Sequence, residues 1–124
     1  MKNEDLRIKL GLNANHTAYF LRAPQEYWQA LGMRQAPYDD NSGEYDFIHA
    51  FFESKEELKN FSDILLSKLS HGGIMWISFP KRHEKSSLSR EDAREVFEPL
   101  GLKAEEEIGI TDNWFAVKFI WKNQ

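Results

Sequence analysis

The sequence predicts a single α/β domain over residues 1–124, with helices packed against a mostly parallel five-stranded sheet. Residues 74–79 are apolar at almost every position, which is typical of a central strand that is covered on both faces. Ser54 to Glu57 and Ser89 to Asp92 have the spacing of helix capping boxes, and they lie before and after this strand. Thr111 to Asn113 is a short polar break between two strand-like segments, which predicts a C-terminal antiparallel hairpin.

The predicted helices and strands alternate, and each lies between residues that start or stop regular structure. Helices are expected over residues 3–10, residues 24–31, the segment from Ser54 to Gly72 and the segment from Ser89 to Pro99. Strands are expected over residues 17–22, 45–52, 74–79, 103–110 and 114–121. Gly72 and Gly73 are expected to end the long helix, and residues 33–44 are expected to form a loop.

The expected strand order, counted along the chain, is 1-2-3-5-4, with the last strand antiparallel. The fourth strand is polar in its first half, which places it near an edge of the sheet. Right-handed crossovers put their helices on one face, yet the second and third strands are apolar on both faces. The other face therefore needs cover from helix 24–31, from helix 3–10 or from a second chain. We expect cover from within the chain and hence a monomer, with a homodimer as the alternative.

The amino-acid composition argues against several classes of protein. The chain has no cysteine, so disulfides and thiolate metal sites are excluded. It has no apolar run long enough to span a bilayer and no signal-peptide pattern, so no membrane association and a cytoplasmic location are expected. The net charge of -4 is spread over both halves of the chain, which argues against binding to nucleic acid.

No residue pattern dictates catalysis or metal binding. The four histidines do not cluster, and His49 lies in the middle of a predicted strand, where a buried or hydrogen-bonded role is expected. Ser78 has no base at a recognisable spacing and no nucleophile elbow around it. Glu105 to Glu107 are best explained as a solvated strand edge.

The order of the predicted elements, ending in an antiparallel hairpin, resembles that of class I methyltransferases. Residues 69–78 resemble their late helix-to-strand passage, and residues 97–102 resemble the entry to their penultimate strand. The sequence is also similar to a family of small bacterial proteins, a domain-of-unknown-function family with a reduced, Rossmann-like methyltransferase domain. The residues that carry this similarity are Lys9 to Leu12, Ala23-Pro24, Asp46 to His49, Trp76 to Lys81, and Asp112 to Trp114 before Lys118-Phe119. The resemblance implies a fold and no established activity.

The departures from methyltransferases concern the site for S-adenosylmethionine. Those enzymes have a glycine-rich turn after the first strand, whereas this turn is Arg22 to Tyr27, with Pro24 and no glycine. Tyr27 and Trp28 leave little room for a nucleotide. Residues 33–44 are too few for the strand, helix and strand that would supply the acid for the ribose. We expect neither S-adenosylmethionine nor any other cofactor to bind.

One group of side chains is expected to share the carboxyl edge of the sheet. Parallel strands end at the same edge, and the turn of the C-terminal hairpin returns to it. The residues expected there are Arg22, Ser78, Lys81, Asp112, Asn113 and Trp114, with Arg82 and Lys85 nearby. This rim suits a small anionic ligand or an anchor for a protein partner. In the alternative interpretation, Trp114 packs into the core and the charges are solvated.

Two functions remain open at this point. The first is a non-catalytic binding module that uses the rim, and the second is a small enzyme of unrecognised chemistry that uses Lys81 with Asp112. An enzyme would show a concave pocket beside Lys81 with a titratable group whose pKa is shifted by its neighbours. A partner surface would show an exposed apolar patch that includes Trp114.

Overall fold

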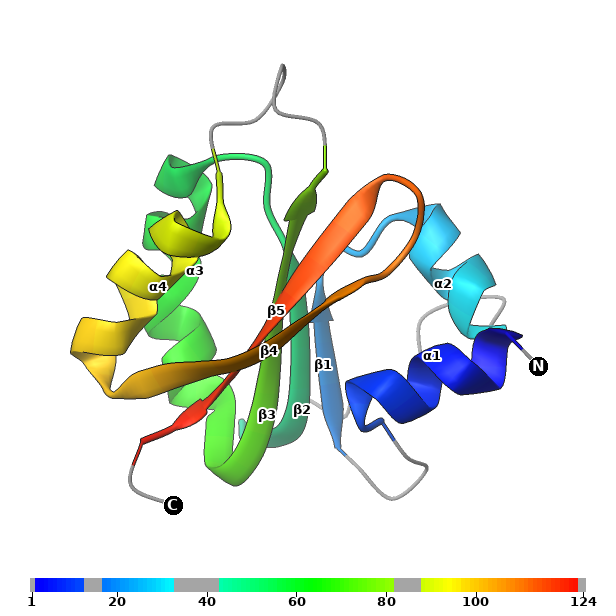
Figure 1. The fold of residues 1–124 in the computed structure, drawn as a ribbon. Coiled ribbons are helices and arrows are strands. Elements are labelled where there is room, and N and C mark those ends of the chain that lie inside the picture. Colours follow the sequence, from blue (N-terminus) through cyan, green and yellow to red (C-terminus); the bar gives the residue numbers. More distant parts are fainter. Residues whose placement is uncertain (1, 13–16, 33–42, 82–87, 123–124) are drawn as a thin grey trace.

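A mixed sheet runs through the middle of the molecule, with strand order β1-β2-β3-β5-β4 (Figure 1). The computed structural model describes residues 2–12, 17–32, 43–81 and 88–122. In chain order the elements are α1 (Lys2–Leu10), β1 (Ala18–Leu21), α2 (Gln25–Leu31), β2 (Tyr45–Phe51), α3 (Lys55–Lys68), β3 (Leu69–Pro80), α4 (Arg90–Phe97), a 3-10 turn (Glu98–Leu100), β4 (Leu102–Gly109) and β5 (Trp114–Trp121). β1, β2 and β3 are parallel, and β5 is antiparallel to both β3 and β4. The predicted fold class, strand order and strand direction are confirmed.

β3 is the central strand, because it pairs with β2 on one side and with β5 on the other. The side chains of Met75, Trp76 and Ile77 are completely buried. Strands that are apolar on both faces require helices on both faces, and the structure supplies them.

The prediction that Gly72 and Gly73 end the long helix is wrong. α3 ends at Lys68, and Leu69 already has extended backbone angles and a buried side chain. Gly72, with φ of 79°, lies inside β3, where the pairing with β2 jumps from Tyr45–Leu69 to Phe47–Ile74. A Cβ on Gly73 would lie 2.9 Å from the Ser70 carbonyl oxygen. The two glycines therefore permit a tight irregularity in a strand rather than a helix end.

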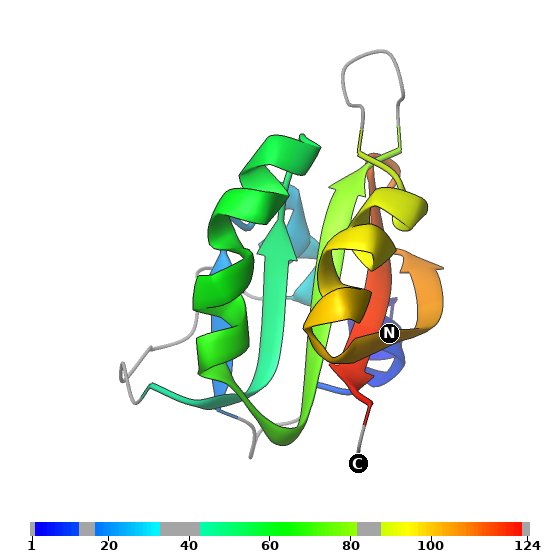
Figure 2. The same ribbon diagram turned by 90° about the vertical axis from the view of Figure 1, so that its left-hand side faces the viewer.

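The helices divide between the two faces of the sheet. α3 and α4 cover one face, and α1 and α2 cover the other (Figures 1 and 2). The α3/α4 face buries an apolar cluster that includes Ile48, Met75, Ile77, Phe97 and Phe119. The α1/α2 face buries a second cluster that includes Leu10, Tyr27, Leu31, Phe47 and Trp76. The expected cover from within the chain is confirmed, and it comes from both candidate helices.

The capping residues of α4 show why this helix begins where it does. The Ser89 hydroxyl accepts a hydrogen bond from the Asp92 backbone amide, and the Asp92 carboxylate accepts one from the Ser89 amide, so the predicted capping box is complete. At α3, Ser54 caps the helix, but the Glu57 carboxylate accepts from the Glu53 amide instead. The start of α4 lies near the end of β3, because Ser89 and Pro80 line the same hollow.

Some predicted features lie outside the described residues. These are residues 33–42 of the predicted loop, the rim cations Arg82 and Lys85, and two of the four histidines, His16 and His83. Among the described helices, none is long and apolar enough to cross a membrane.

Candidate functional site

The end of β3 meets the β4–β5 turn, as the sequence predicts. Pro80 pairs with Trp114, and the Lys81 backbone amide donates a hydrogen bond of 2.9 Å to the Asn113 carbonyl oxygen. The Lys81 side chain is exposed and lies against β4, because a Cβ on Gly109 would be 3.3 Å from the Lys81 Nζ. Because Gly109 has no side chain, there is room for the Lys81 ammonium beside β4.

Arg22 is at the same edge but is held elsewhere. Its backbone has a φ of 62°, in the left-handed region, and its Nη2 donates to Glu57 Oε2 at 3.0 Å. This exposed ion pair joins the end of β1 to the first turn of α3. Arg22 is therefore separated from Lys81 by β2 and is not brought together with it.

The expectation that Ser78 lines the rim is wrong. Its side chain is completely buried, and its Oγ lies 2.6 Å from Nε2 of His49, which is also completely buried. The Nδ1 of His49 lies 2.9 Å from the Tyr27 hydroxyl. β3 turns Ser78 towards the α1/α2 face, so the serine ends in a packed polar cluster instead of at the edge.

The expected hydrogen-bonded role of His49 is confirmed. Burial lowers the pKa of His49 to about 3, so the imidazole is neutral at ordinary pH. The hydroxyls of Ser78 and Tyr27 can each donate or accept, which satisfies both ring nitrogens in either tautomer. Sequence reasoning missed the pairing of His49 with Ser78 because the two residues come from different strands. The side chains of Tyr27, His49 and Ser78 are all completely buried. Their contacts therefore join α2, β2 and β3 inside the core.

The turn residues are mainly structural. The Asn113 side-chain amide lies 3.3 Å from both carboxylate oxygens of Glu26, and Thr111 donates to the same carboxylate. Trp114 is half-buried, with its ring edge-on to Phe51 at 5.3 Å between centroids. This agrees with the alternative interpretation, in which Trp114 packs into the core. Asp112 is exposed, and no contact described in the structure joins its carboxylate to the Lys81 ammonium.

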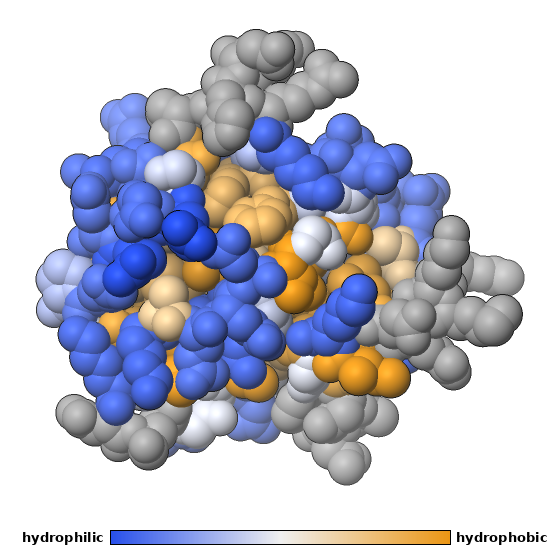
Figure 3. Space-filling model, in the orientation of Figure 1, coloured by the Kyte–Doolittle hydropathy of each residue, from blue (hydrophilic) through white to orange (hydrophobic). Residues whose placement is uncertain are grey.

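A hollow of about 440 Å³ lies beside Lys81, between the end of β3, the start of α4 and the β4–β5 hairpin. Its lining consists of Phe79, Pro80, Lys81, Ser89, Arg90, Glu91, Glu107 and Phe115. In the view of Figure 3, hydrophobic residues are exposed between hydrophilic ones in the upper middle of the molecule. The hollow is on the α3/α4 face, because Phe79 and Phe115 belong to that cluster.

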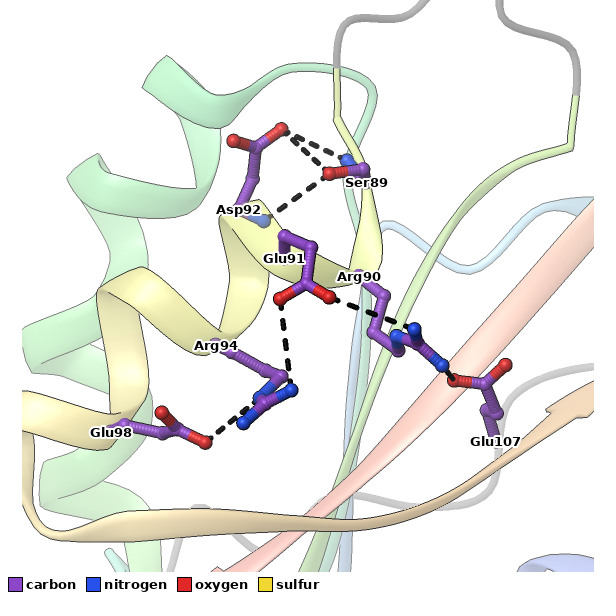
Figure 4. A network of polar contacts seen from close by, with 7 residues as sticks. All are labelled: Ser89, Arg90, Glu91, Asp92, Arg94, Glu98 and Glu107. Atoms are coloured by element: carbon purple, nitrogen blue, oxygen red, sulfur yellow. Dashed lines mark hydrogen bonds and ion pairs between the residues drawn. The ribbon is translucent and has the colours of Figure 1, made fainter.

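Charged side chains of α4 and β4 form a network of polar contacts (Figure 4), and three of them, Arg90, Glu91 and Glu107, line the hollow. Arg90 Nη1 lies 2.6 Å from Glu107 Oε2, and Arg90 Nη2 lies 3.6 Å from Glu91 Oε2. Arg94 is shared between Glu98, at 2.9 Å, and Glu91, at 3.7 Å. The hydrogen bond that Arg90 donates to the Glu107 carboxylate raises the pKa of Arg90, so this group stays charged and does not transfer protons. Across the described parts of the chain, Lys81 makes no such ion pair.

Sequence reasoning identified Lys81 but missed the rest of the lining. The capping box at Ser89 indicated that a helix begins soon after β3, which was the available signal for Arg90 and Glu91. The sequence predicts that Glu107 belongs to a solvated strand edge. Nothing in the sequence indicates that Glu107 contacts Arg90. Within the described residues, no group of three potential metal ligands lies together.

No family model and no curated protein matches the sequence. Solved structures do match. The chain is similar to a ribosomal protein L11 methylase from Lactobacillus delbrueckii subsp. bulgaricus, with a TM-score of 0.62 and 13% identity over 98% of this chain and 78% of that one. It is similar to magnesium protoporphyrin IX methyltransferase from Synechocystis, with a TM-score of 0.62 and 11% identity over 97% and 78% of the two chains.

A third similar structure is an S-adenosylmethionine-dependent methyltransferase from Clostridium acetobutylicum, with a TM-score of 0.58 and 9% identity over 97% of this chain and 91% of that one. Similarity at such low sequence identity shows a shared fold, and it does not show a shared activity. The strand order and the flanking helices agree with these neighbours. The chain therefore has a class I methyltransferase-like fold, reduced to a five-stranded sheet with an antiparallel last strand.

Proposed function

We propose that the chain is a binding module that holds a small ligand through an anionic group in the hollow beside Lys81. The observation that carries this proposal is the Lys81 ammonium, which lines a hollow of about 440 Å³ and makes no ion pair with the described residues. A cation at the wall of a concave, partly apolar hollow attracts an anion more strongly than a cation on an open surface.

The size of the hollow favours an organic ligand. Its volume is within the range of about 300–1,000 Å³ that small-molecule sites occupy. A water molecule has a share of roughly 30 Å³, so an inorganic ion of similar size would leave most of the hollow unfilled. The aromatic side chains of Phe79 and Phe115 offer an apolar surface for the remainder of an organic molecule.

Three observations support binding over catalysis and over a protein anchor. The pKa of Arg90, which lines the hollow, is raised by its hydrogen bond to Glu107, so this group is permanently charged. The base and hydroxyl that do lie together, His49 and Ser78, are enclosed on the opposite face of the sheet. Trp114 packs on Phe51, which removes the aromatic anchor on which a protein-docking rim would depend.

Replacing Lys81 with alanine should abolish stabilisation by ligands with an anionic group. Thermal-shift measurements of the wild-type protein with a panel of small carboxylates and phosphates should show compounds that raise its unfolding temperature, because a ligand that binds the native state stabilises it. Lys81→Ala should lose these shifts. The matched control is Lys103→Ala, which removes an equally exposed cation outside the hollow and should keep them. Equal shifts in all three proteins, or none in any, would contradict the proposal.

The residues after β1 do not fit S-adenosylmethionine. β1 is at the edge of the described sheet, so no further strand supplies an acid for the ribose. The turn after β1 passes from Arg22 through Ala23 to Pro24, the cap of α2, and Tyr27 and Trp28 behind it are buried. The Arg22–Glu57 ion pair lies across this edge. These features support a module without methyl-transfer activity.

Titration calorimetry with S-adenosylmethionine should therefore show no specific heat of binding at micromolar protein concentration. The methyltransferase from Clostridium acetobutylicum, measured in the same buffer, serves as the positive control. A saturable isotherm with a micromolar dissociation constant for this chain would refute the expectation.

A further inference from the structure

We infer that the ligand of the hollow is an aromatic zwitterion of the amino-acid class: a carboxylate, an ammonium group and an aromatic ring. This inference rests on the proposed function, because it takes Lys81 as the group that holds the carboxylate. It adds the other two parts of the ligand from the remaining walls of the hollow.

The ring is assigned by the apolar wall. Phe115 is half-buried and lines the hollow, and its ring lies 5.7 Å from that of Phe79, at an angle of 52°. Pro80 adds a second flat apolar surface beside them. A third aromatic ring against this pair gains both buried apolar area and the favourable tilted geometry of aromatic contacts. An aliphatic ligand would gain the area alone.

The ammonium group is assigned by the charged side chains that α4 and β4 contribute to the lining. Arg90 carries one positive charge, and Glu91 and Glu107 carry two negative charges, so these three side chains have a net charge of -1. Lys81 supplies a further +1 to the lining. A simple anion would meet repulsion from the glutamates, whereas a ligand with a charge of each sign complements both signs of charge in the lining.

Glu91 is the acceptor for that ammonium. Its ion pairs with Arg90 and Arg94 are 3.6 and 3.7 Å long, beyond hydrogen-bond distance, and its side chain is 62% exposed. Glu107 already accepts the short bond from Arg90. The Glu91 carboxylate therefore retains room to accept a hydrogen bond from a ligand without first losing one.

The test compares L-phenylalanine with three compounds that each lack one part, by calorimetry or by chemical-shift titration. We expect 3-phenylpropionate, which lacks the ammonium, and phenethylamine, which lacks the carboxylate, to bind roughly fivefold more weakly than L-phenylalanine. L-alanine, which lacks the ring, should bind at least about tenfold more weakly. Glu91→Gln should lower the affinity for L-phenylalanine to that for 3-phenylpropionate and leave the affinity for 3-phenylpropionate unchanged or higher.

Glu56→Gln, an exposed charge change on α3, is the control and should bind as the wild type does. Unfolding temperatures of the variants separate loss of binding from loss of folding. If 3-phenylpropionate binds as tightly as L-phenylalanine and loses affinity in Lys81→Ala, the zwitterion is wrong and the anion site stands. If L-phenylalanine binds equally well to Lys81→Ala, or if none of the four compounds binds, the inference is overturned. The thermal-shift measurements with small carboxylates and phosphates then test separately whether the hollow binds an anionic group.

Discussion

Lowering the pH from 6.5 to 4 should destabilise the protein by roughly 3 kcal/mol through His49 alone. The unfolded chain binds a proton at the ordinary histidine pKa of 6.5, whereas burial lowers the pKa in the folded protein to about 3. Between these values the unfolded state carries the extra proton, so the free energy of unfolding falls as the pH falls. The contribution of the neutral His49 to the free energy of unfolding is fully present above pH 6.5, and it is lost as the pH falls towards 3.

Urea unfolding at pH 7, 6, 5 and 4 measures this effect. The wild type is compared with His49→Gln, which is expected to be less stable at pH 7 because the contacts to Ser78 and Tyr27 are disturbed, but to lose less stability on acidification. Contributions from groups other than His49 are common to both proteins and cancel in the difference. His71→Gln, a change at an exposed histidine, should keep the wild-type slope. Parallel pH profiles for the wild type and His49→Gln would show that His49 is not the cause.

Trp76→Phe should reduce the free energy of unfolding by about 2–3 kcal/mol. Trp76 is completely buried in β3, and its indole Nε1 donates a hydrogen bond of 2.8 Å to the Leu10 carbonyl oxygen. Phenylalanine has no donor, so it leaves a buried carbonyl at the end of α1 unsatisfied and a smaller ring in the α1/α2 cluster. Because this bond joins α1 to the sheet, the variant should also expose α1 to proteases earlier than the rest of the chain.

The matched control is Trp114→Phe, the same substitution at a half-buried position in the same cluster, where we expect a loss below about 1 kcal/mol. Chemical denaturation gives the two free energies, and limited proteolysis followed by mass spectrometry locates the first cleavage. Equal losses in the two variants, or first cleavage outside α1, would show that the bond to Leu10 does not anchor this helix.

Much of the fold could be predicted because local chemistry carries it. The apolar run of residues 74–79 indicated a central strand, the polar first half of residues 103–110 indicated an edge, and the break at Thr111 to Asn113 indicated the hairpin. The structure confirms each of them. The exception is the end of α3, where burial of Leu69 in the core decides the boundary, and Gly72 and Gly73 belong to β3.

The candidate site was less predictable. Pro80 ends a buried strand, so Lys81 could be placed at the carboxyl edge from the sequence. Whether Ser78 reached the same edge depended on which face of β3 it occupied and how deeply the helices covered that face. The structure turns it towards His49 and encloses it.

By itself, the sequence determined the order of the elements, the N-terminal caps of α3 and α4, the strand order of the sheet and the need for cover on both faces, because these follow from periodicity and from residues that start or stop regular structure. Tertiary structure alone decided that Arg22 pairs with Glu57, that His49 meets Ser78 and Tyr27, and that Arg90 and Glu91 line the same hollow as Phe115 and Lys81. Each of these contacts joins side chains from different elements. Their proximity depends on strand register and on the position of each helix over the sheet, and those are set by the packing of the whole core.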